Sequence, residues 1–186
     1  MFKRSPTGEA FCPDGVTDAP QPLLQRSTRN SLIIFIASFV LLQWAWNAAR
    51  DTWVERLVIH EATVKPAAAL VQLITPAANA RPVAASIKAP GGGLNILVGC
   101  EGVEVMFLLI AAFAAVRLGW RRKLIGLGLG LTLVFVLNQG RILALFYAFR
   151  NQRSLFDLLH TTVLPVVLIA AVALYFYAVL QRSRLA

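Results

Sequence analysis

The sequence has little charge and almost no cysteine, and both shortages narrow the class of protein. Only 15% of its residues are Asp, Glu, Lys or Arg, against about 25% in an average soluble domain. Its two cysteines, Cys12 and Cys100, are far apart and in different contexts, so they predict neither a disulfide framework nor a zinc site. The chain is instead 58% hydrophobic, with a mean hydropathy of +0.66. This composition excludes a disordered chain and predicts a membrane protein, for which we expect no metal and no cofactor.

Four apolar runs are long enough, or nearly so, to cross a bilayer as helices. A hydrocarbon core of about 30 Å needs about 20 helical residues. The predicted spans are 30–49, 102–116, 124–149 and 158–181. The first run is too long, and starts too far into the chain, to be a cleavable signal peptide. The fold class that follows is an all-α membrane protein with about four transmembrane helices.

Lys and Arg outnumber Asp and Glu by 18 to 9, which gives a net charge of +9. On a soluble protein this excess would suggest a nucleic-acid partner, but on an apolar chain it marks loops at the cytoplasmic face. With both termini and the turn at 117–123 in the cytoplasm, that side carries ten basic and three acidic residues, net +7. The other side keeps eight basic and six acidic residues, net +2. We therefore expect both termini in the cytoplasm, the lipid bilayer as a partner and no nucleic acid.

The segments outside the spans differ in character. The first is rich in proline and polar residues, which is typical of a disordered cytoplasmic tail. The outer segment has apolar residues at helical spacing over 53–74, broken at Pro66, which predicts an amphipathic helix on the membrane surface. Two apolar runs, 83–87 and 94–98, flank a Pro-Gly-Gly-Gly turn and predict a small hairpin beside it. The predicted boundaries are 1–29 for the tail, 30–49 for the first span, 50–99 for the outer segment and 100–184 for a three-helix core.

Three polar residues in or next to the predicted spans converge on one depth. A central Arg or Asp in a membrane helix costs about 2.5–3.5 kcal/mol on insertion scales, so each such residue needs a reason. Counted from the cytoplasmic anchors, Cys100 and Arg141 lie roughly 25 Å along their helices, and His160 roughly 33 Å. Three helices therefore bring a thiol, a guanidinium and an imidazole to a similar level near the outer boundary.

Helical spacing adds polar neighbours to these three residues. Side chains three or four residues apart share a face of a helix. The pairs are Cys100 with Glu104, Asn138 with Arg141, and Asp157 with His160. We therefore expect Glu104, Asn138 and Asp157 to support a site built from the other three.

These residue types suit nucleophilic catalysis. A free thiol has a pKa of about 8.5 and must lose its proton to attack a carbonyl. The imidazole of His160 can take that proton, and the helix N-terminus at Cys100 favours the anion. Arg141 stays protonated, so it cannot be a base, but it can stabilise an oxyanion or hold a substrate carbonyl or carboxylate.

Each of these residues alone also has an ordinary structural explanation. A cysteine can pack as a small apolar side chain, a boundary arginine can snorkel, and an asparagine can join helices. The alternative functions are a non-catalytic assembly or scaffold subunit and, less favoured, a transporter subunit. A transporter calls for inverted repeats or broken midplane helices, and the sequence has neither. Three suitable side chains at one depth favour catalysis.

Three short motifs resemble those of a known family. Residues 100–104 (CEGVE), residues 138–142 (NQGRI) and His160 resemble the Cys-x-Gly, Asn-x-x-Arg and His signatures of the exosortase/archaeosortase family. The Gly-Val-Glu after the cysteine and the short chain are most similar to exosortase H. The resemblance covers Asn95 to Arg184, about half of the chain.

The resemblance implies a bacterial inner-membrane cysteine protease or transpeptidase with its active site facing the periplasm. Its substrate would be the C-terminal sorting tail of exported proteins, made of a short motif, a transmembrane helix and a basic cluster. By the same likeness, Cys100 is the nucleophile, Arg141 the transition-state stabiliser and His160 the general acid and base, with a thioester intermediate. Two departures stand out: many family members have more spans, and here Glu101 follows the cysteine. A carboxylate there should raise the pKa of the thiol unless a cation such as Arg141 offsets it.

Overall fold

The structure, a computed structural model, describes residues 22–90, 92–96 and 100–185. Most of the predicted tail, residues 1–21, lies outside this range, and its last part, residues 22–29, forms the start of the first helix. The helices before the sheet are α1 (Pro22–Ala48), α2 (Trp53–Arg56), the π-helix η1 (Leu57–Val64), α3 (Lys65–Ile74) and the 3₁₀-helix η2 (Pro76–Ala78). The strands are β1 (Arg81–Val83), β2 (Ser86–Lys88) and β3 (Leu94–Asn95). The later helices are α4 (Val103–Ala115), α5 (Trp120–Asn151), α6 (Arg153–Leu158), the π-helix η3 (Leu159–Val163) and α7 (Leu164–Leu185).

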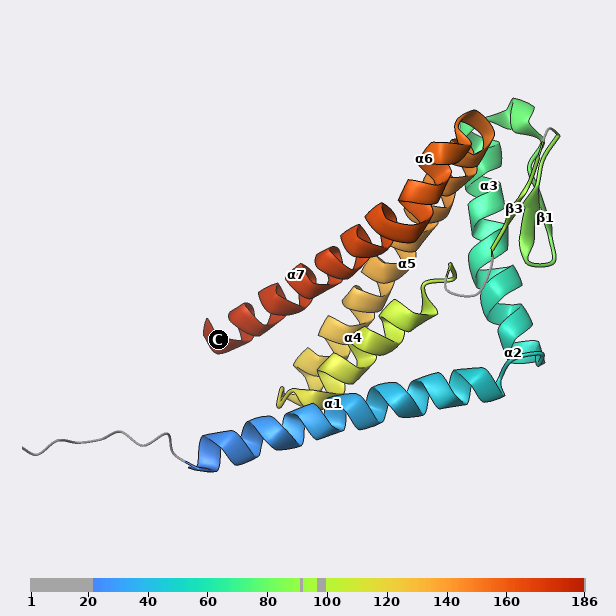
Figure 1. The fold of residues 1–186 in the computed structure, drawn as a ribbon. Helices are drawn as coiled ribbons and strands as arrows, with labels where there is room; N and C mark the ends of the chain where they lie inside the picture. The colour runs from blue at the N-terminus through green and yellow to red at the C-terminus, as the bar shows by residue number, and fades with distance from the viewer. Residues whose placement is uncertain (1–21, 91, 97–99, 186) are drawn as a thin grey trace, which may run out of the picture.

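Four helices, α1, α4, α5 and α7, form a bundle (Figure 1). The start of α1, the connection from α4 to α5 and the end of α7 lie at one end of it, to the left in Figure 1. The run α2–η1–α3 crosses the other end, where α3 packs on α5 and the sheet lies beside it. We call this second end the outer end. It brings together the starts of α4 and α6 and the end of α5.

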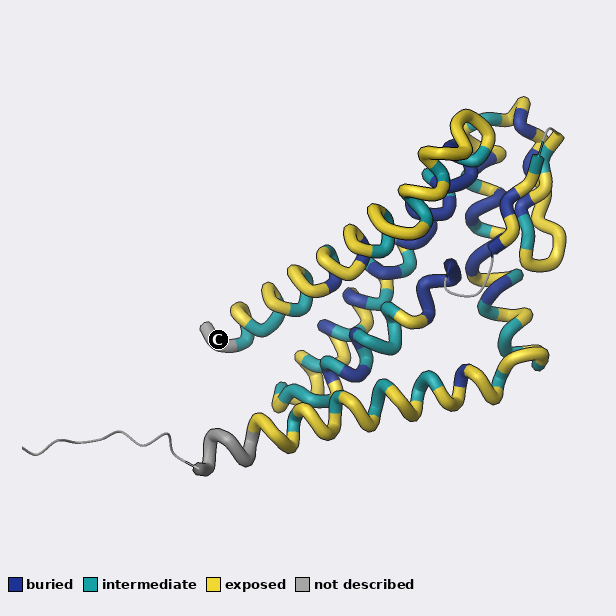
Figure 2. Tube along the Cα trace, in the orientation of Figure 1, coloured by how far each residue is buried: buried dark blue, intermediate teal, exposed yellow. Residues whose placement is uncertain are grey.

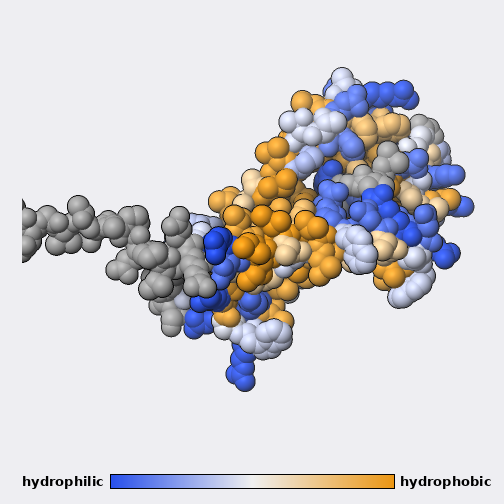
Figure 3. All heavy atoms as spheres, turned by 60° about the horizontal axis from the view of Figure 1, so that its bottom comes forward, coloured by the Kyte–Doolittle hydropathy of each residue, from blue (hydrophilic) through white to orange (hydrophobic). Residues whose placement is uncertain are grey.

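The bundle surface is apolar where it is exposed, as expected of helices that face lipid. Along α1 and α7 most of the chain is exposed or half-buried (Figure 2). The visible face in Figure 3 has an apolar belt between hydrophilic patches at its two ends. Four described helical runs are long and apolar enough to cross a membrane: Thr28–Ala48, Trp53–Ile74, Trp120–Asn151 and Arg153–Ser183. The chain is therefore an all-α multi-pass membrane protein, as predicted.

One of these four helical runs is not among the four predicted spans. The predicted span 102–116 is α4, which has 13 residues and is about 20 Å long. It is shorter than the core of a bilayer, although it packs inside the bundle between α1 and α5. The run Trp53–Ile74, predicted to lie on the surface, has the length and composition of a span instead. Because it crosses the end of the bundle, its place in Figure 1 is that of a cover over the outer end.

Proline widens two of the helices without breaking them. The helix over 53–74 continues through Pro66, the second residue of α3, after the π-helical segment η1. The last helix repeats this arrangement, because Pro165 is the second residue of α7 and follows η3. Proline has no N–H and its ring clashes with the carbonyl four residues earlier. A π-helical turn, with i→i+5 hydrogen bonds, moves that carbonyl out of the way. The predicted break at Pro66 is therefore wrong.

The predicted hairpin is one half of a three-stranded antiparallel sheet with the order β1-β2-β3. Ile87 pairs with Leu94, as a hairpin around the Pro-Gly-Gly-Gly turn requires. The run 83–87 is not one strand, however, because Val83 pairs with Ser86 across a two-residue turn. Ala84 adopts a positive φ of 51° in this turn, where sequence patterns lead one to expect glycine or asparagine. This is why the turn left no signal in the sequence.

Two apolar clusters hold the fold together. One lies at the outer end and joins α3, the sheet and α5 through side chains such as Val71, Ile87 and Phe146. It includes Cys100, which places the predicted nucleophile in packed surroundings. The other cluster lies within the bundle around Leu109. The core at the outer end therefore fixes the segments that carry the candidate site.

Candidate active site

Cys100 lies in a tight turn just before α4, and Gly102 makes that turn possible. Gly102 caps α4 with a φ of 76°, a left-handed conformation that side chains with a Cβ rarely adopt. A Cβ at this position would lie 2.8 Å from Cγ of Asn138. Both the backbone angle and the close approach therefore require glycine. The thiol of Cys100 is buried, with 5% of the residue exposed.

Asn138 ties this turn to α5. Its Nδ2 donates a hydrogen bond to the backbone oxygen of Cys100, with 3.2 Å between the two atoms. Asn138 is among the most deeply buried side chains of the described chain, at 2% exposed. A buried amide whose donor is satisfied by a fixed carbonyl holds both partners in register. The prediction that Asn138 supports the cysteine therefore agrees with the geometry.

His160 approaches Cys100 from a different helix. Its Nε2 lies 2.9 Å from Sγ of Cys100 in a hydrogen bond between residues 60 positions apart in the chain. The imidazole is half-buried, lies in the π-helix η3, and stacks on the ring of Phe156, with centroids 5.5 Å apart and 21° between the planes. Stacking fixes the plane of the imidazole, and its Nε2 lies within hydrogen-bond distance of the thiol. Thiol and imidazole are thus placed as a nucleophile and its base.

Arg141 is buried on the same side of α5 as Asn138. Only 8% of the residue is exposed, and residues three apart on a helix share a face. Because Asn138 points to the backbone of Cys100, Arg141 lies on the face of α5 that is turned toward the cysteine turn, closer to the outer end. A guanidinium on this face is suited to hold negative charge that develops near the thiol.

The other two supporting residues do not join this group. Glu104 is exposed in the first turn of α4, and among the described residues it makes no ion pair with Arg141. Asp157 is exposed as well, and in the part of the chain that the structure describes its carboxylate makes no hydrogen bond to His160. Helix α4 begins only at Val103, and His160 lies in a π-helical turn. In both places, the side chains that share a face therefore differ from those that regular α-helical spacing predicts.

Glu101 and Gln139 are buried beside the site, which the sequence analysis did not predict. Glu101 is 5% exposed, and within the described chain its Oε2 has no hydrogen-bond partner. Gln139 is equally buried, and its Nε2 donates to the backbone oxygen of Ala62 in η1, at 3.5 Å. Pro66 has no N–H to offer that oxygen, so the proline was a signal for an outside donor. Gln139 therefore attaches the helix over 53–74, which covers the outer end and is called the covering helix below, to α5, which carries Arg141.

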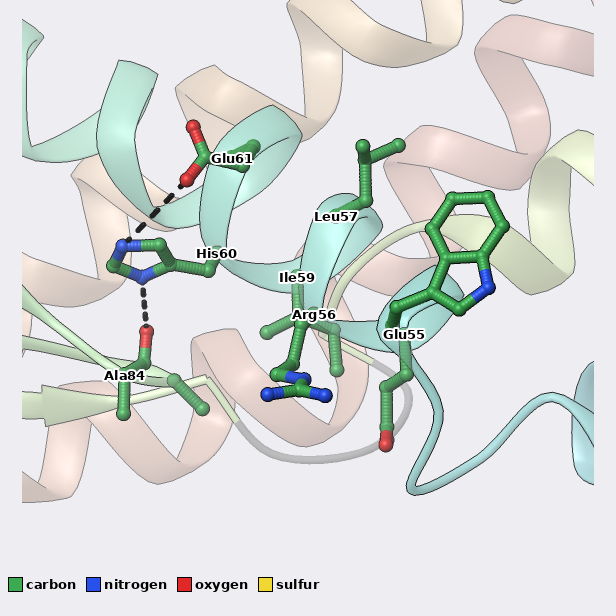
Figure 4. A pocket seen from close by; sticks show the side chains of 9 residues that line it. Glu55, Arg56, Leu57, Ile59, His60, Glu61 and Ala84 are labelled. Carbon is green, nitrogen blue, oxygen red and sulfur yellow. Dashed lines mark hydrogen bonds and ion pairs between the residues drawn. The ribbon is translucent and has the colours of Figure 1, made fainter.

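A pocket with described walls lies elsewhere, between η1 and the turn of the β1–β2 hairpin (Figure 4). It has a volume of about 740 Å³, and none of the predicted site residues lines it. His60 donates from Nδ1 to the backbone oxygen of Ala84, at 2.8 Å, and its Nε2 faces Glu61 at 4.0 Å. The histidine here joins the covering helix to the sheet. None of the described residues that line this pocket is Cys or Ser, so the Cys100–His160 pair remains the better candidate for chemistry.

Comparison with known proteins adds a family to this geometry. Residues 60–177, more than half of the chain, match the family described as Transmembrane exosortase. The match begins well before Asn95, so it includes most of the covering helix and the sheet as well as the motifs. Searches of curated proteins and of solved structures gave no match. Among the described residues, no three His, Cys, Asp or Glu side chains are placed to hold a metal ion.

Proposed function

The chain belongs to the transmembrane exosortase family, and from this premise we propose that it is a cysteine protease or transpeptidase. Its substrate is the C-terminal sorting tail of exported proteins: a short motif, a transmembrane helix and a basic cluster. The observation that carries the proposal is the 2.9 Å contact between Sγ of Cys100, in the turn before α4, and Nε2 of His160, in η3. A structural cysteine needs no such partner.

The first half of the reaction transfers the substrate to the enzyme. Nε2 of His160 takes the thiol proton, and Sγ of Cys100 attacks the carbonyl carbon of the scissile peptide bond. The N-terminus of α4, which begins at Val103, favours the thiolate. Arg141 stabilises the oxyanion of the tetrahedral intermediate. The imidazolium then gives its proton to the leaving amine, the C–N bond breaks, and the tail departs from a thioester on Cys100.

The second half frees the enzyme. Water or the amine of an acceptor attacks the thioester carbonyl while His160 takes a proton from it. The C–S bond breaks, the sulfur takes the proton back from the imidazolium, and the product leaves as an acid or as a new amide. The buried position of the thiol limits the approach of water, which supports a role for an acceptor amine.

We place the protein in the bacterial inner membrane, with both termini in the cytoplasm and the outer end in the periplasm. The distribution of charge supports this orientation, since the end with the α4–α5 turn and the end of α7 has the cations Arg121, Arg122, Lys123 and Arg182. An exported protein that is still anchored by its tail helix would then present its motif to the outer end.

Processing of an exported reporter that carries a sorting tail tests the proposal. Cys100→Ala, Arg141→Ala and His160→Ala should each abolish the shortening of the reporter, at equal expression. Two variants serve as controls and should process normally: Cys12→Ala removes the other cysteine, and Glu104→Gln changes an exposed residue close to the site. A scaffold subunit would make no demand on Cys100. Normal processing by Cys100→Ala therefore rules the proposal out.

A further inference from the structure

We propose that a pocket between the sheet and the corner from α5 to α6 is a specificity subsite. It holds one apolar side chain of the substrate's motif, roughly two to three residues from the scissile bond. This inference rests on the proposed function and names the part of the site that would read the substrate. The pocket has a volume of about 530 Å³ and lies at the outer end of the bundle, beside the candidate catalytic pair.

The walls of the pocket are mostly apolar. Ala89 and Leu94 contribute from the β2–β3 hairpin, and Phe149 and Phe156 contribute from the two helices. The two phenylalanine rings meet edge to face, with centroids 5.5 Å apart. Aliphatic and aromatic walls favour an apolar occupant, because its transfer from water is favourable in proportion to the area buried.

The pocket shares a side chain with the candidate active site. Phe156 lines it and also stacks on His160, with 5.5 Å between the ring centroids. The pocket is therefore one ring away from the imidazole that contacts Cys100. An extended peptide advances about 3.3 Å per residue, so a substrate with its carbonyl at the thiol reaches the pocket two to three residues away. This continuity argues for the substrate's motif as the occupant.

The charges around the pocket argue against another part of the tail. Lys88 lines it, and the guanidinium of Arg153 lies 5.6 Å above the ring of Phe149. None of the residues that line it is Asp or Glu. The basic cluster of a sorting tail would be repelled here and would lie on the opposite side of the membrane. An uncharged side chain of the motif would neither be repelled by these cations nor lie on the opposite side of the membrane.

Close contact across the hairpin turn narrows the pocket. A Cβ at Gly92 would meet Cε1 of Phe149 at 3.4 Å, and a Cβ at Gly93 would come within 2.8 Å of the backbone oxygen of Ile87. Gly93 therefore lets the hairpin close on its own backbone, and a Cβ at Gly92 would be in ordinary contact with Phe149. The pocket's width is thus fixed by the turn on one side and by the aromatic pair on the other.

A filled and an enlarged pocket test the inference with opposite expected results. Ala89→Phe places a ring in the pocket, and Phe149→Ala removes one. The probe is the reporter–tail fusion, with each residue of its motif varied in turn. Ala89→Phe should raise KM about tenfold or more for a motif with a large apolar residue at one position, and glycine or alanine at that position should restore processing. Phe149→Ala should shift the preference at the same position toward tryptophan. Val83→Phe, on the exposed strand β1 outside the pocket, is the matched control and should change nothing.

The rate of Cys100 alkylation by iodoacetamide is measured in every variant, since an intact thiol–imidazole pair should keep it unchanged. If Ala89→Phe lowers processing equally for every motif, the inference is wrong and the pocket holds something else, such as an acyl chain. If the wild-type protein cuts no tail at all, the proposed function fails, and the inference fails with it. If the wild type cuts and neither variant changes any positional preference, the inference alone fails.

Discussion

Gly102 decides whether Cys100, the proposed nucleophile, can lie beside Asn138. Its positive φ turns the chain into α4, and its missing Cβ leaves room for the amide that bonds the backbone of Cys100. The Cys-x-Gly signature thus has a structural reason for its third position. The carbonyl of Cys100 is held by Asn138, and the thiol is left to meet His160.

Gly102→Ala should therefore destabilise the protein by about 1–3 kcal/mol and slow tail processing. The left-handed backbone is strained by a Cβ, and the methyl group displaces Asn138 from the turn. Gly140→Ala is the control, because nothing lies within 4 Å of a Cβ there and the position is in the interior of a helix. It should be neutral or stabilise by about 0.5–1 kcal/mol. Thermal unfolding in detergent and the processing rate measure both effects, and equal behaviour of the two variants would contradict this explanation.

The sequence was sufficient to predict that Cys100, His160 and Asn138 lie close together, because a polar residue in or next to an apolar helix needs a partner. It was not sufficient for Glu104 and Asp157, since their assignment assumed regular helical faces. Burial of Glu101 depends on the turn that Gly102 creates, and spacing alone does not reveal that turn.

At the scale of the helices, a proline follows the widened turn that carries the imidazole of His160. η3 ends where α7 begins, and Pro165 is the second residue of α7. The widened turn accommodates the proline and sets the direction from which His160 reaches Cys100. Hydropathy predicted the span from 158 to 181, but it contains no information on which turn of a helix is widened.

Pro165→Ala should let η3 relax toward a regular α-helix, because alanine supplies the missing N–H. The helix becomes intrinsically more stable, while the imidazole rotates away from the thiol. We therefore expect slower processing together with unchanged or increased thermal stability. Val166→Ala changes an exposed neighbour and keeps the proline, so it should process normally. Faster processing or unchanged processing in Pro165→Ala would show that the widened turn does not set the imidazole.

Other element boundaries could not be predicted from the sequence, for local reasons. The turn between β1 and β2 uses Ala84 in a conformation that its sequence does not announce. α4 stops short of a full span because the chain leaves the helix after Ala115, although the apolar run continues to Val116. The four long apolar runs gave the fold class correctly, and the position of the helix over 53–74 had to come from three-dimensional packing on α5.

For the whole molecule, the short α4 determines the depth of the turn with Cys100 relative to the membrane. Its 13 residues extend about 20 Å, against a hydrocarbon core of about 30 Å. If its inner end is at the cytoplasmic boundary, the turn with Cys100 lies below the outer boundary, under the cover formed by α3 and the sheet. A substrate anchored by its own helix can reach this depth without leaving the bilayer.

Cysteine accessibility in intact cells tests this orientation. In a Cys12→Ala background, Val83→Cys should react with a membrane-impermeant maleimide from outside, because β1 is exposed at the outer end. Trp120→Cys, exposed at the start of α5, should react only after the inner membrane is permeabilised. The reverse pattern would contradict an outer end in the periplasm.

The most direct test of the central claim is the mass of the protein trapped during turnover with a tail-bearing reporter. We predict a thioester between Cys100 and the new C-terminus of the reporter, which hydroxylamine releases and which is absent from His160→Ala. Reporter that is cleaved at the wild-type rate by Cys100→Ala, or an adduct on any residue other than Cys100, would contradict the account.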